Sequence, residues 1–454
     1  MNKLSDCQQR QVSWLKIVAL LILLLLLSAC GEEAARGPGG GGQMAQGSAP
    51  PTLYVLDGLP SSGSQRLLVF QPSSGGSINA RIFPAGLLGS DRRHLYRALS
   101  QGGETTIEVT DLSTGTRLPS LVIPGSYATT DAGTGKSMLS GDGRWLALRD
   151  LKTPTGMTHI VLIDTRAAKV VKTIDLKGDF DLDAIAPEGN ALYLLEYLDR
   201  AAYRYNVRVY DLAAGQLVPG AIVDKNEPDE KMQGLALTRQ LSLDGEVAFT
   251  LYINPQTNKA FIHVLPLTYR TGVPLVARCL DLPTGTGPQA SALLHFYILF
   301  LGRDTQTVYA VNAALGVAAL ISLAPMAQGG VTALREPWTT SFHPSLPRLP
   351  ADAAAMQRQL ANGAVASLQQ TRLYVVGLRG IWVFSLPGLE LLTVYLPQSV
   401  FTGLELEIGQ GRLYAVGPTE GIIPIDSASG MAERPLPVPA RAPWGIGWLG
   451  ASQP

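Results

Sequence analysis

A short apolar run, most often a Leu-Tyr pair or its equivalent, recurs along the chain from Thr52 onward. The copies follow one another at intervals of about 40 to 55 residues, except for one interval of about 77 residues between Tyr297 and Tyr374. A pattern that repeats at a nearly fixed period indicates a repeat architecture in which each unit is one supersecondary element. Eight copies can be counted: Leu53-Tyr54-Val55, Leu95-Tyr96, Trp145-Leu146-Ala147, Leu192-Tyr193-Leu194, Val247-Ala248-Phe249, Phe296-Tyr297-Ile298, Leu373-Tyr374-Val375 and Leu413-Tyr414-Ala415.

Turn signals divide each unit into strands. A second apolar run often ends in Asp with Gly four residues later, where the Asp side chain caps the turn backbone and Gly takes a positive φ. This pair occurs as Asp111 with Gly115, Asp211 with Gly215 and Asp426 with Gly430, and in degraded form as Gln71 with Gly75, Asn312 with Gly316 and Asp164 with Ala168. Tight-turn signals that predict hairpins precede several Leu-Tyr runs, at Gly141-Asp142-Gly143, Glu188-Gly189-Asn190 and Asp244-Gly245.

Each unit has the order strand, turn, strand, loop, strand, Asp-x-x-x-Gly turn and strand. This order resembles a blade of the YVTN and WD40-like β-propellers. The resemblance implies an all-β fold, a β-propeller spanning residues 52–454, with eight blades by repeat count and seven as the alternative. The units at Val247 and Phe296 are the least regular copies. A β-sandwich is the competing all-β fold, but sandwiches do not require a regular period.

The two ends of the repeat region are complementary. The last apolar stretch, Trp444 to Leu449, has the character of an inner strand with nothing following it, whereas the first unit at Thr52 lacks an inner strand. We expect both to join in one blade, because pairing the N- and C-terminal strands closes the ring and removes two open sheet edges.

The long interval predicts an insertion at about residues 326–370. Within it, Pro350 to Asn362 has the pattern of one short helix, with Pro in the first turn, apolar residues on one face and Gly363 just after the end. Such a helix must pack on the ring. It is either a cover for an apolar patch between blades or a docking element for a partner.

The N-terminal segment has the pattern of an export signal, with three basic residues before an apolar core from Ile17 to Leu27. The sequence Leu27-Ser28-Ala29-Cys30 resembles the lipobox of bacterial lipoproteins, which implies that residues 1–29 are a signal peptide and that Cys30 receives the lipid. The uncharged stretch Ile17–Ala29 is far shorter than the roughly 20 residues needed to span a bilayer. We therefore expect anchoring by lipid.

Residues 30–51 are rich in Gly, Ala, Ser and Pro and predict a flexible tether. The expected location is extracytoplasmic, with the lipid on Cys30 in the cell membrane or the outer membrane. Without residues 1–29, the chain keeps 33 basic and 35 acidic side chains, a net charge of −2. This balance gives no attraction to nucleic acid, and we expect a monomer whose partner is a protein or a glycan.

Cysteine usage excludes a disulfide framework. Cys7 lies in the signal and Cys30 is the lipid acceptor, which leaves Cys279 alone in the strand-like run Val276 to Leu280. A reactive thiol is one interpretation, but a cysteine in an apolar strand usually packs as a small hydrophobic residue.

No catalytic, cofactor-binding or metal-binding residues are expected. The five histidines, His94, His159, His263, His295 and His343, fall at different positions of their units, and the usual metal-ligand spacings are missing. The strongest cation candidate is Asp179, Asp181 and Asp183, whose alternate acids would share one side of a strand and could bind a hard cation such as calcium. The simpler interpretation, which we prefer, is a set of solvated acids at the entry to a strand.

Three further features of the sequence have simple structural interpretations. His343 lies near Trp338 in the insertion, where surface packing is the simpler interpretation. Gly133 to Ser137 imitates the end of a phosphate-binding loop but lacks its first glycine and precedes an inner strand instead of a helix. The mixed charges from Asp224 to Lys231 predict a solvated loop.

The preferred function is a membrane-tethered propeller that acts as a protein- or glycan-binding or scaffold module. Two alternatives stay open. One is a lactonase-like propeller hydrolase with a central metal. The other is an envelope-assembly propeller lipoprotein; that family has a Trp after the Asp-x-x-Thr-Gly turn, whereas Asp111 to Gly115 here is followed by Thr116-Arg117-Leu118-Pro119, which also counts against a pyrroloquinoline quinone cofactor.

Overall fold

The computed structural model divides the chain into two units, Met1–Pro50 and Pro51–Pro454. It describes residues 52–58, 65–72, 78–129, 135–224, 231–242, 244–273, 275–285, 290–302, 307–322, 338–341, 363–367, 369–377, 379–407 and 411–449, all in the second unit. The predicted signal peptide, Cys30 and the tether lie outside these residues. Among the described helices, none has the length and apolar character needed to cross a membrane.

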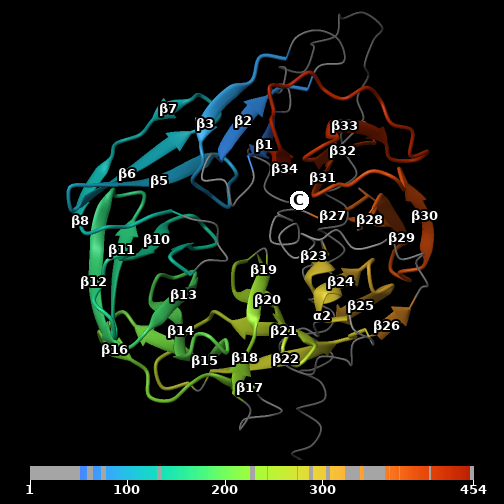
Figure 1. Ribbon diagram of the computed structural model, residues 1–454. Helices are drawn as coiled ribbons and strands as arrows, with labels where there is room; N and C mark the ends of the chain where they lie inside the picture. The colour runs from blue at the N-terminus through green and yellow to red at the C-terminus, as the bar shows by residue number, and fades with distance from the viewer. Residues whose placement is uncertain are drawn as a thin grey trace, which may run out of the picture. The chain divides into compact units, whose positions relative to one another are not determined.

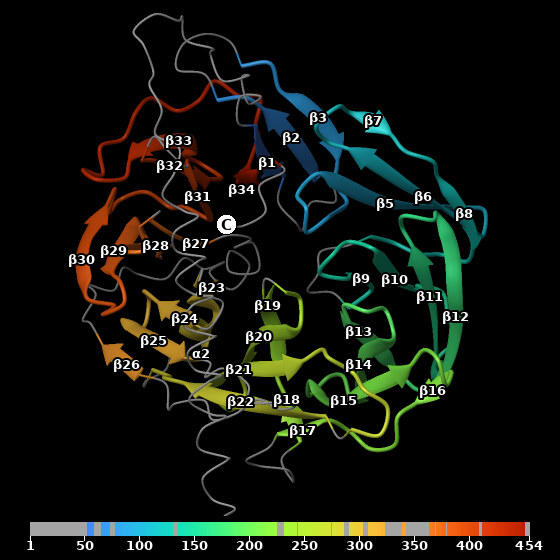
Figure 2. The ribbon, with the colours of Figure 1, turned by 180° about the vertical axis from the view of Figure 1, so that it is seen from behind.

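Within the second unit, the strands form eight sheets that follow one another around a central axis (Figures 1 and 2). Each sheet consists of consecutive, mostly antiparallel strands, which is the arrangement of propeller blades. The fold is an eight-bladed β-propeller. The structure thereby confirms the predicted fold class and the repeat count of eight instead of seven.

The first four blades are given from the inner strand outward. Blade 1 consists of β34 (Pro443–Trp448), β1 (Leu53–Asp57), β2 (Arg66–Phe70) and β3 (Arg81–Pro84). Blade 2 consists of β4 (Leu87–Leu88), β5 (His94–Gln101), β6 (Glu104–Asp111), β7 (Thr116–Arg117) and β8 (Leu121–Pro124). Blade 3 consists of β9 (Ser137–Leu139), β10 (Trp145–Arg149), β11 (Met157–Asp164) and β12 (Lys169–Lys177). Blade 4 consists of β13 (Phe180–Ile185), β14 (Ala191–Asp199), β15 (Arg204–Asp211), β16 (Gln216–Leu217) and β18 (Met232–Gln233).

The other four blades follow the same order. Blade 5 consists of β19 (Leu235–Leu241), β20 (Val247–Asn254), β21 (Lys259–Pro266) and β22 (Val276–Leu282), with β17 (Val223–Asp224) added in parallel at its edge. The helix α2 (Ala290–Leu293) and the 3₁₀ turn η3 (Leu294–Phe296) lead into blade 6, which consists of β23 (Tyr297–Leu301), β24 (Thr307–Asn312), β25 (Val317–Ser322) and β26 (Trp338–Ser341). Blade 7 consists of β27 (Ala364–Ala366), β28 (Arg372–Val376), β29 (Ile381–Ser385) and β30 (Leu391–Tyr395). Blade 8 consists of β31 (Gly403–Glu407), β32 (Arg412–Gly417) and β33 (Gly421–Asp426).

The ring closes in blade 1, as predicted. Strand β34 pairs with β1 from Leu53 opposite Trp448 to Asp57 opposite Pro443, so the first and last described strands share one sheet (Figure 1). The indole N–H of Trp448 also donates a hydrogen bond of 2.8 Å to the carbonyl oxygen of Leu406 in blade 8. The C-terminal strand thus connects blade 1 to the blade that precedes it in the ring.

The predicted Asp-x-x-x-Gly turns are present. The carboxylate of Asp211 accepts hydrogen bonds from the backbone N–H groups of Ala213 and Ala214 at 2.9 and 2.8 Å, and Gly215 has a φ of 70°. The carboxylates of Asp111, Asp164 and Asp426 cap their turns in the same way. Each of these turns follows the third strand of its blade. In the degraded pair of Gln71 with Gly75, Gln71 directly follows β2, whereas Gly75 lies outside the described residues.

Blade 6 departs from the predicted alignment. Seven of the eight apolar runs form the second strand of a blade, but Tyr297 lies in β23, the inner strand of blade 6. The second strand there is β24, and the turn from Asn312 to Gly316 therefore follows the second strand instead of the third. Inner and second strands are both short and buried on two faces, so the apolar pattern alone does not tell them apart.

The predicted helix from Pro350 to Asn362 lies outside the described residues, as does His343. The short described helix, α2, is at a different place, between blades 5 and 6. Its residues Ala290 and Leu293 are buried.

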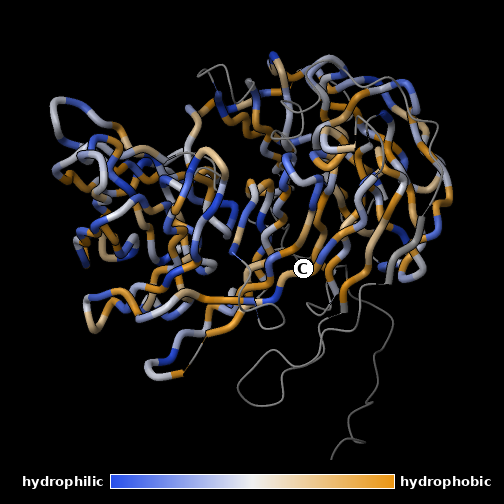
Figure 3. Tube along the Cα trace, turned by 60° about the horizontal axis from the view of Figure 1, so that its bottom comes forward, coloured by the Kyte–Doolittle hydropathy of each residue, from blue (hydrophilic) through white to orange (hydrophobic). Residues whose placement is uncertain are grey.

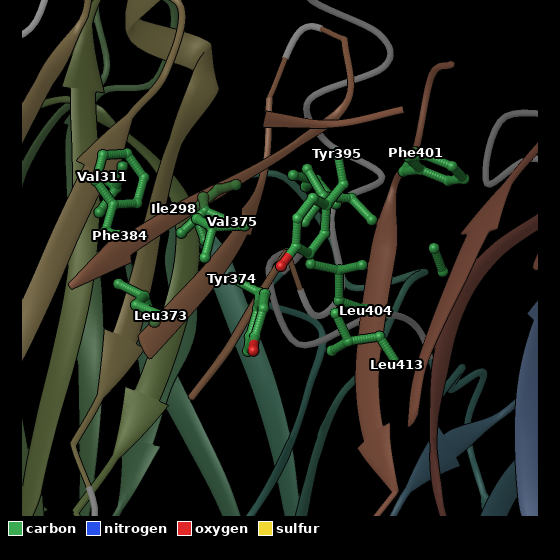
Figure 4. Close-up of a cluster of buried hydrophobic side chains, with 14 of the residues drawn as sticks. Ile298, Val311, Leu373, Tyr374, Val375, Phe384, Tyr395, Phe401, Leu404 and Leu413 are labelled. Carbon is green, nitrogen blue, oxygen red and sulfur yellow. The ribbon is translucent and has the colours of Figure 1, made fainter. Parts of the chain in front are cut away.

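The core lies between neighbouring blades, because successive side chains of a strand point to opposite faces of its sheet. In blade 7, Leu373 belongs to the face that packs with Ile298 and Val311 of blade 6, whereas Tyr374 lies with Leu404 and Leu413 of blade 8 (Figure 4). Similar clusters fill the other interfaces between blades. Hydrophobic positions accordingly run along the strands, and hydrophilic positions gather in the turns (Figure 3).

Candidate functional site

The three acids that the sequence singles out for a cation lie at the start of the inner strand of blade 4. Asp179 directly precedes β13, and Asp181 and Asp183 lie within it. Asp181 and Asp183 are buried, whereas the side chain of Asp179 is about two-fifths exposed. Their positions at the start of a strand agree with the prediction.

Asp183 lies at an irregularity of the strand. The pairing of β13 with β14 matches Leu182 with Leu194 and then Ala184 with Tyr193, so Asp183 is the extra residue of a β-bulge. A bulge bends the strand and changes the direction of the side chain at that point. Asp181 is hydrogen-bonded to Arg149 of blade 3, whereas Asp183 pairs with Arg239 of blade 5. Neighbouring blades on both sides therefore supply partners for these acids.

Arginines bind all three acids. Arg149, at the end of β10 in blade 3, donates hydrogen bonds to Asp181 at 2.8 Å and to Asp179 at 3.2 Å. Arg200, in the turn between β14 and β15, donates to both carboxylates at distances of 2.7 to 2.8 Å. On the other side, Arg239 of β19 in blade 5 forms an ion pair with Asp183. We call these six residues the acid–arginine cluster.

The electrostatics of the cluster favour an ionised Asp179 with arginine as its counter-charge. The hydrogen bonds from Arg200 lower the pKa of Asp179, and Asp179 raises the pKa of Arg200 in turn. The Arg200 guanidinium also lies 3.8 Å from the ring centre of Tyr197. With three acids and three arginines, the cluster has no excess negative charge for a cation. Among the described residues, no group of three or more His, Cys, Asp or Glu side chains could hold a metal ion.

The four described histidines do not converge on one point. His94 and His159 form surface pairs with Asp91 and Asp175 at 2.5 and 2.6 Å. His295 is buried in η3. His263 is 1% exposed in β21, and burial lowers its pKa to about 4. Two of these four histidines thus lie at the surface and two are buried in different parts of the ring.

A buried polar row separates blades 4 and 5. The strand register of blade 5 places Arg239, Thr250, His263 and Cys279 next to one another on four adjacent strands. Arg239 donates a hydrogen bond of 2.9 Å to the hydroxyl of Thr250. Because Cβ atoms directly opposite on adjacent strands point to the same face, all four side chains face blade 4. The row runs from the inner strand of the blade to its outer strand.

One predicted loop differs from the structure, and one predicted strand entry agrees with it. Asp224, predicted to lie in a solvated loop, is 7% exposed in β17, and its carboxylate accepts a hydrogen bond from the backbone N–H of Cys279. Residues 225–230 of that predicted loop lie outside the described part. By contrast, Lys136 and Ser137 lead into the inner strand β9, as the sequence predicts.

Exposed aliphatic side chains gather at one end of three consecutive blades. The outer strand of each blade ends at the side of the propeller where the inner strand of the next blade begins. In a blade of antiparallel strands, the hairpin between the second and third strands turns at this same side. Five such side chains lie in or beside the hairpins β5–β6, β10–β11 and β14–β15, and we call them the hairpin rim. They are Leu99, Val122, Leu151, Met157 and Leu198, with exposed fractions of 39, 56, 45, 39 and 53%.

The acid–arginine cluster lies next to this rim, because Arg200 follows Leu198 by two residues and Arg149 precedes Leu151 by two residues. The other exposed large apolar residues lie mostly on outer strands, such as Val171 of β12 and Leu392 of β30, and are spread around the ring. Sequence analysis missed the rim. A signal was present, since Leu151 and Leu198 stand in or directly beside a turn, but the sequence alone does not show that their side chains are exposed.

Comparison with known proteins adds the fold alone. No family model matches the chain, and no curated protein matches it. Among solved structures, Citrobacter koseri AztD has 12% identity over 87% of this chain and 96% of its own, with a TM-score of 0.49. The dihydro-heme d1 dehydrogenase NirN has 16% identity over 88% and 75%, with a TM-score of 0.48. A proposed 6-phosphogluconolactonase of Bacteroides fragilis has 13% identity over 89% and 99%, with a TM-score of 0.44. These similarities are too weak to transfer an activity.

Proposed function

We propose that this protein is an extracytoplasmic, membrane-tethered β-propeller lipoprotein that binds a protein partner through the hairpin rim. In this proposal, the signal peptide 1–29 is removed, the lipid on Cys30 holds the chain at the membrane, and residues 30–51 give the propeller freedom to reach its partner. The fold supplies a rigid frame, and the binding surface lies on hairpin loops, as is common for proteins of this architecture.

The observation that carries the proposal is the concentration of exposed aliphatic side chains on blades 2 to 4. Single exposed apolar residues are ordinary, but several at one end of adjacent elements indicate an interaction surface. Arg200 and Asp179 beside Leu198 supply polar groups at the edge of this apolar surface, which is the composition of a protein interface. All large hydrophobic side chains exposed in the described part are aliphatic, whereas sugar rings are usually bound by aromatic faces. The rim therefore favours a protein over a glycan.

The hydrolase alternative is not favoured by the acid–arginine cluster. A central metal needs carboxylates that converge on one point with lone pairs to spare. Here arginines from blades 3, 4 and 5 already occupy the three carboxylates. An envelope-assembly role is a special case of partner binding, and the identity of the partner would decide it.

The rim is tested by photo-crosslinking in cells. A photoreactive amino acid at Leu151 or Leu198 should form a defined adduct with one envelope protein, whereas the same amino acid at Val171, equally exposed but on the outer strand of blade 3, should not. The double variant L151D/L198D should lose co-purification of that protein, and V171D should retain it. Adducts of equal yield at all three positions would refute the rim as the binding surface.

The anchor is tested separately. Replacing Cys30 by Ser should move the protein from the membrane fraction to the soluble fraction, and metabolic labelling with a fatty acid should disappear. Full membrane retention of C30S would refute the lipoprotein part of the proposal without affecting the rim.

A further inference from the structure

Two sulfur atoms and an imidazole meet at the outer end of the polar row between blades 4 and 5. The Sγ atom of Cys279 in β22 lies 3.6 Å from the Sδ atom of Met232 in β18. Cys279 carries a reduced thiol and is half-buried. These two residues are 47 positions apart in the sequence and come from different blades, so only the docking of blade 4 on blade 5 brings them together.

His263 lies next to this pair. It is directly opposite Cys279 in the β21–β22 ladder, which places the two side chains on the same face with Cβ atoms about 5 Å apart. His263 is 1% exposed, and its Nδ1 atom has no hydrogen-bond partner among the described residues. A buried imidazole nitrogen in this state is costly unless a ligand or a water molecule occupies it.

We propose that Cys279, Met232 and His263 form a binding site for a monovalent copper ion. The site goes beyond the proposed partner binding and does not depend on it. Thiolate, thioether and imidazole are the ligands that copper(I) prefers, whereas calcium and magnesium prefer oxygen. A thiolate with a monovalent cation also gives a neutral site, which suits a half-buried interface.

The distance between the two sulfur atoms fits this assignment. With metal–sulfur bonds of about 2.3 Å, two sulfur atoms 3.6 Å apart can bind one ion at a sulfur–metal–sulfur angle of about 100°. The carboxylate of Asp224 holds the backbone N–H of Cys279 from the adjacent strand β17. This contact fixes the position of Cys279 from outside the ligand set, as outer groups commonly do at metal sites.

The ligand set also disfavours zinc. Structural zinc sites have four ligands drawn from Cys, His and carboxylates, and thioethers are not among them. With one thiolate and one imidazole, this site offers only two of the four.

The test uses the full-length chain with C7S and C30S, so that Cys279 is the remaining cysteine of the sequence. The protein is titrated anaerobically with copper(I) in competition with the chromophoric chelator bicinchoninate. We expect one copper ion per chain and copper–sulfur distances in X-ray absorption spectra. C279S should abolish retention. M232L should weaken affinity by more than about tenfold, because even changes outside the ligand set of a metal site cost 10- to 100-fold.

Matched controls separate binding from folding. M431L changes a methionine that is 72% exposed elsewhere and should bind copper like the parent chain. H263Q should weaken copper binding while circular dichroism shows the same strand content. If that variant does not fold, copper retention by M232L and C279S tests the site instead. No retained copper in the parent chain, or equal retention by M232L, C279S and M431L, would overturn the proposal.

Discussion

The side-chain hydroxyl of Thr158 accepts a hydrogen bond of 3.0 Å from the backbone N–H of Phe180. The same hydroxyl donates at 2.9 Å to the carbonyl oxygen of Gly178, so one buried threonine on the third strand of blade 3 fixes the chain as it crosses to blade 4. Blade 2 repeats the arrangement: Thr105 bridges Gly125 and Tyr127 at 2.8 and 3.1 Å. In both blades the threonine precedes the aromatic residue by 22 positions.

Loss of this threonine bridge should destabilise the propeller. Thr158→Val keeps the shape of the side chain but leaves the buried N–H of Phe180 unsatisfied, which should cost about 1–3 kcal/mol. Thr158→Ser keeps the hydroxyl and should cost less. Urea denaturation of both variants measures the difference. Equal stability of the Val variant and the unmodified protein would show that the bridge contributes nothing.

Much of the fold could be predicted from the sequence, because the features that define it are local. The Asp211 to Gly215 turn needs one side-chain oxygen and one positive φ, both of which can be read from residue types. Ring closure follows in the same way from an inner strand that is present at one end of the chain and missing at the other. The threonine bridge was overlooked although its sequence pattern, Gly-x-Thr followed by Gly-x-aromatic, is regular in blades 2 and 3.

The candidate site could be predicted only in part, because it depends on geometry between blades. The sequence singled out Asp179, Asp181 and Asp183, but neither the bulge at Asp183 nor the arginines that bind these acids could be read from residue spacing. Their arginine partners lie up to 56 residues away, beyond the reach of spacing arguments. The soft-ligand group at Cys279 is of the same kind, since Met232 reaches it from another blade.

The buried ion pair between Asp183 and Arg239 should be sensitive to substitution. The two side chains are 1% and 15% exposed, so Asp183→Asn leaves the guanidinium without its counter-charge and should cost about 3–5 kcal/mol. The matched control is Asp199→Asn, which breaks an exposed pair with Arg204 and should cost at most about 1 kcal/mol. Equal effects in chemical denaturation would contradict this role of Asp183.

Acid should weaken the propeller through its turn carboxylates. The hydrogen bond from Arg93 is the main cause that lowers the pKa of Asp111 below its unfolded value of about 3.9. A lowered carboxyl pKa gives stability that is present above the unfolded value and is lost as the pH falls through the folded value. Asp111→Asn keeps the turn acceptor but removes the charge.

The stability difference between Asp111→Asn and the unmodified protein should therefore shrink when urea denaturation is repeated at a pH of about 3 instead of about 6. A difference that stays constant with pH would show that the charge of Asp111 is not involved.

Ring closure should depend on the inner strand β34. Ile446 is fully buried among Leu53, Leu68 and Tyr414, and Ile446→Ala should cost about 2–5 kcal/mol. Ile82 lies in the outer strand of the same blade and is 50% exposed, so Ile82→Ala should change stability by no more than about 0.5 kcal/mol. Thermal unfolding of the two variants compares them directly. A mild effect at Ile446 would mean that closure adds little to stability.

Asp179, Asp181 and Asp183 bind arginines and not a cation, which leaves the hairpin rim as the proposed functional surface. The most direct measurement is thermal unfolding of the purified protein before and after exhaustive treatment with a chelator of calcium and magnesium, together with analysis of those metals in the untreated sample. The account predicts the same unfolding temperature and no stoichiometric calcium or magnesium. One such ion per chain, with a large fall in unfolding temperature on its removal, would show that the acids bind a cation and would favour the metal-dependent hydrolase.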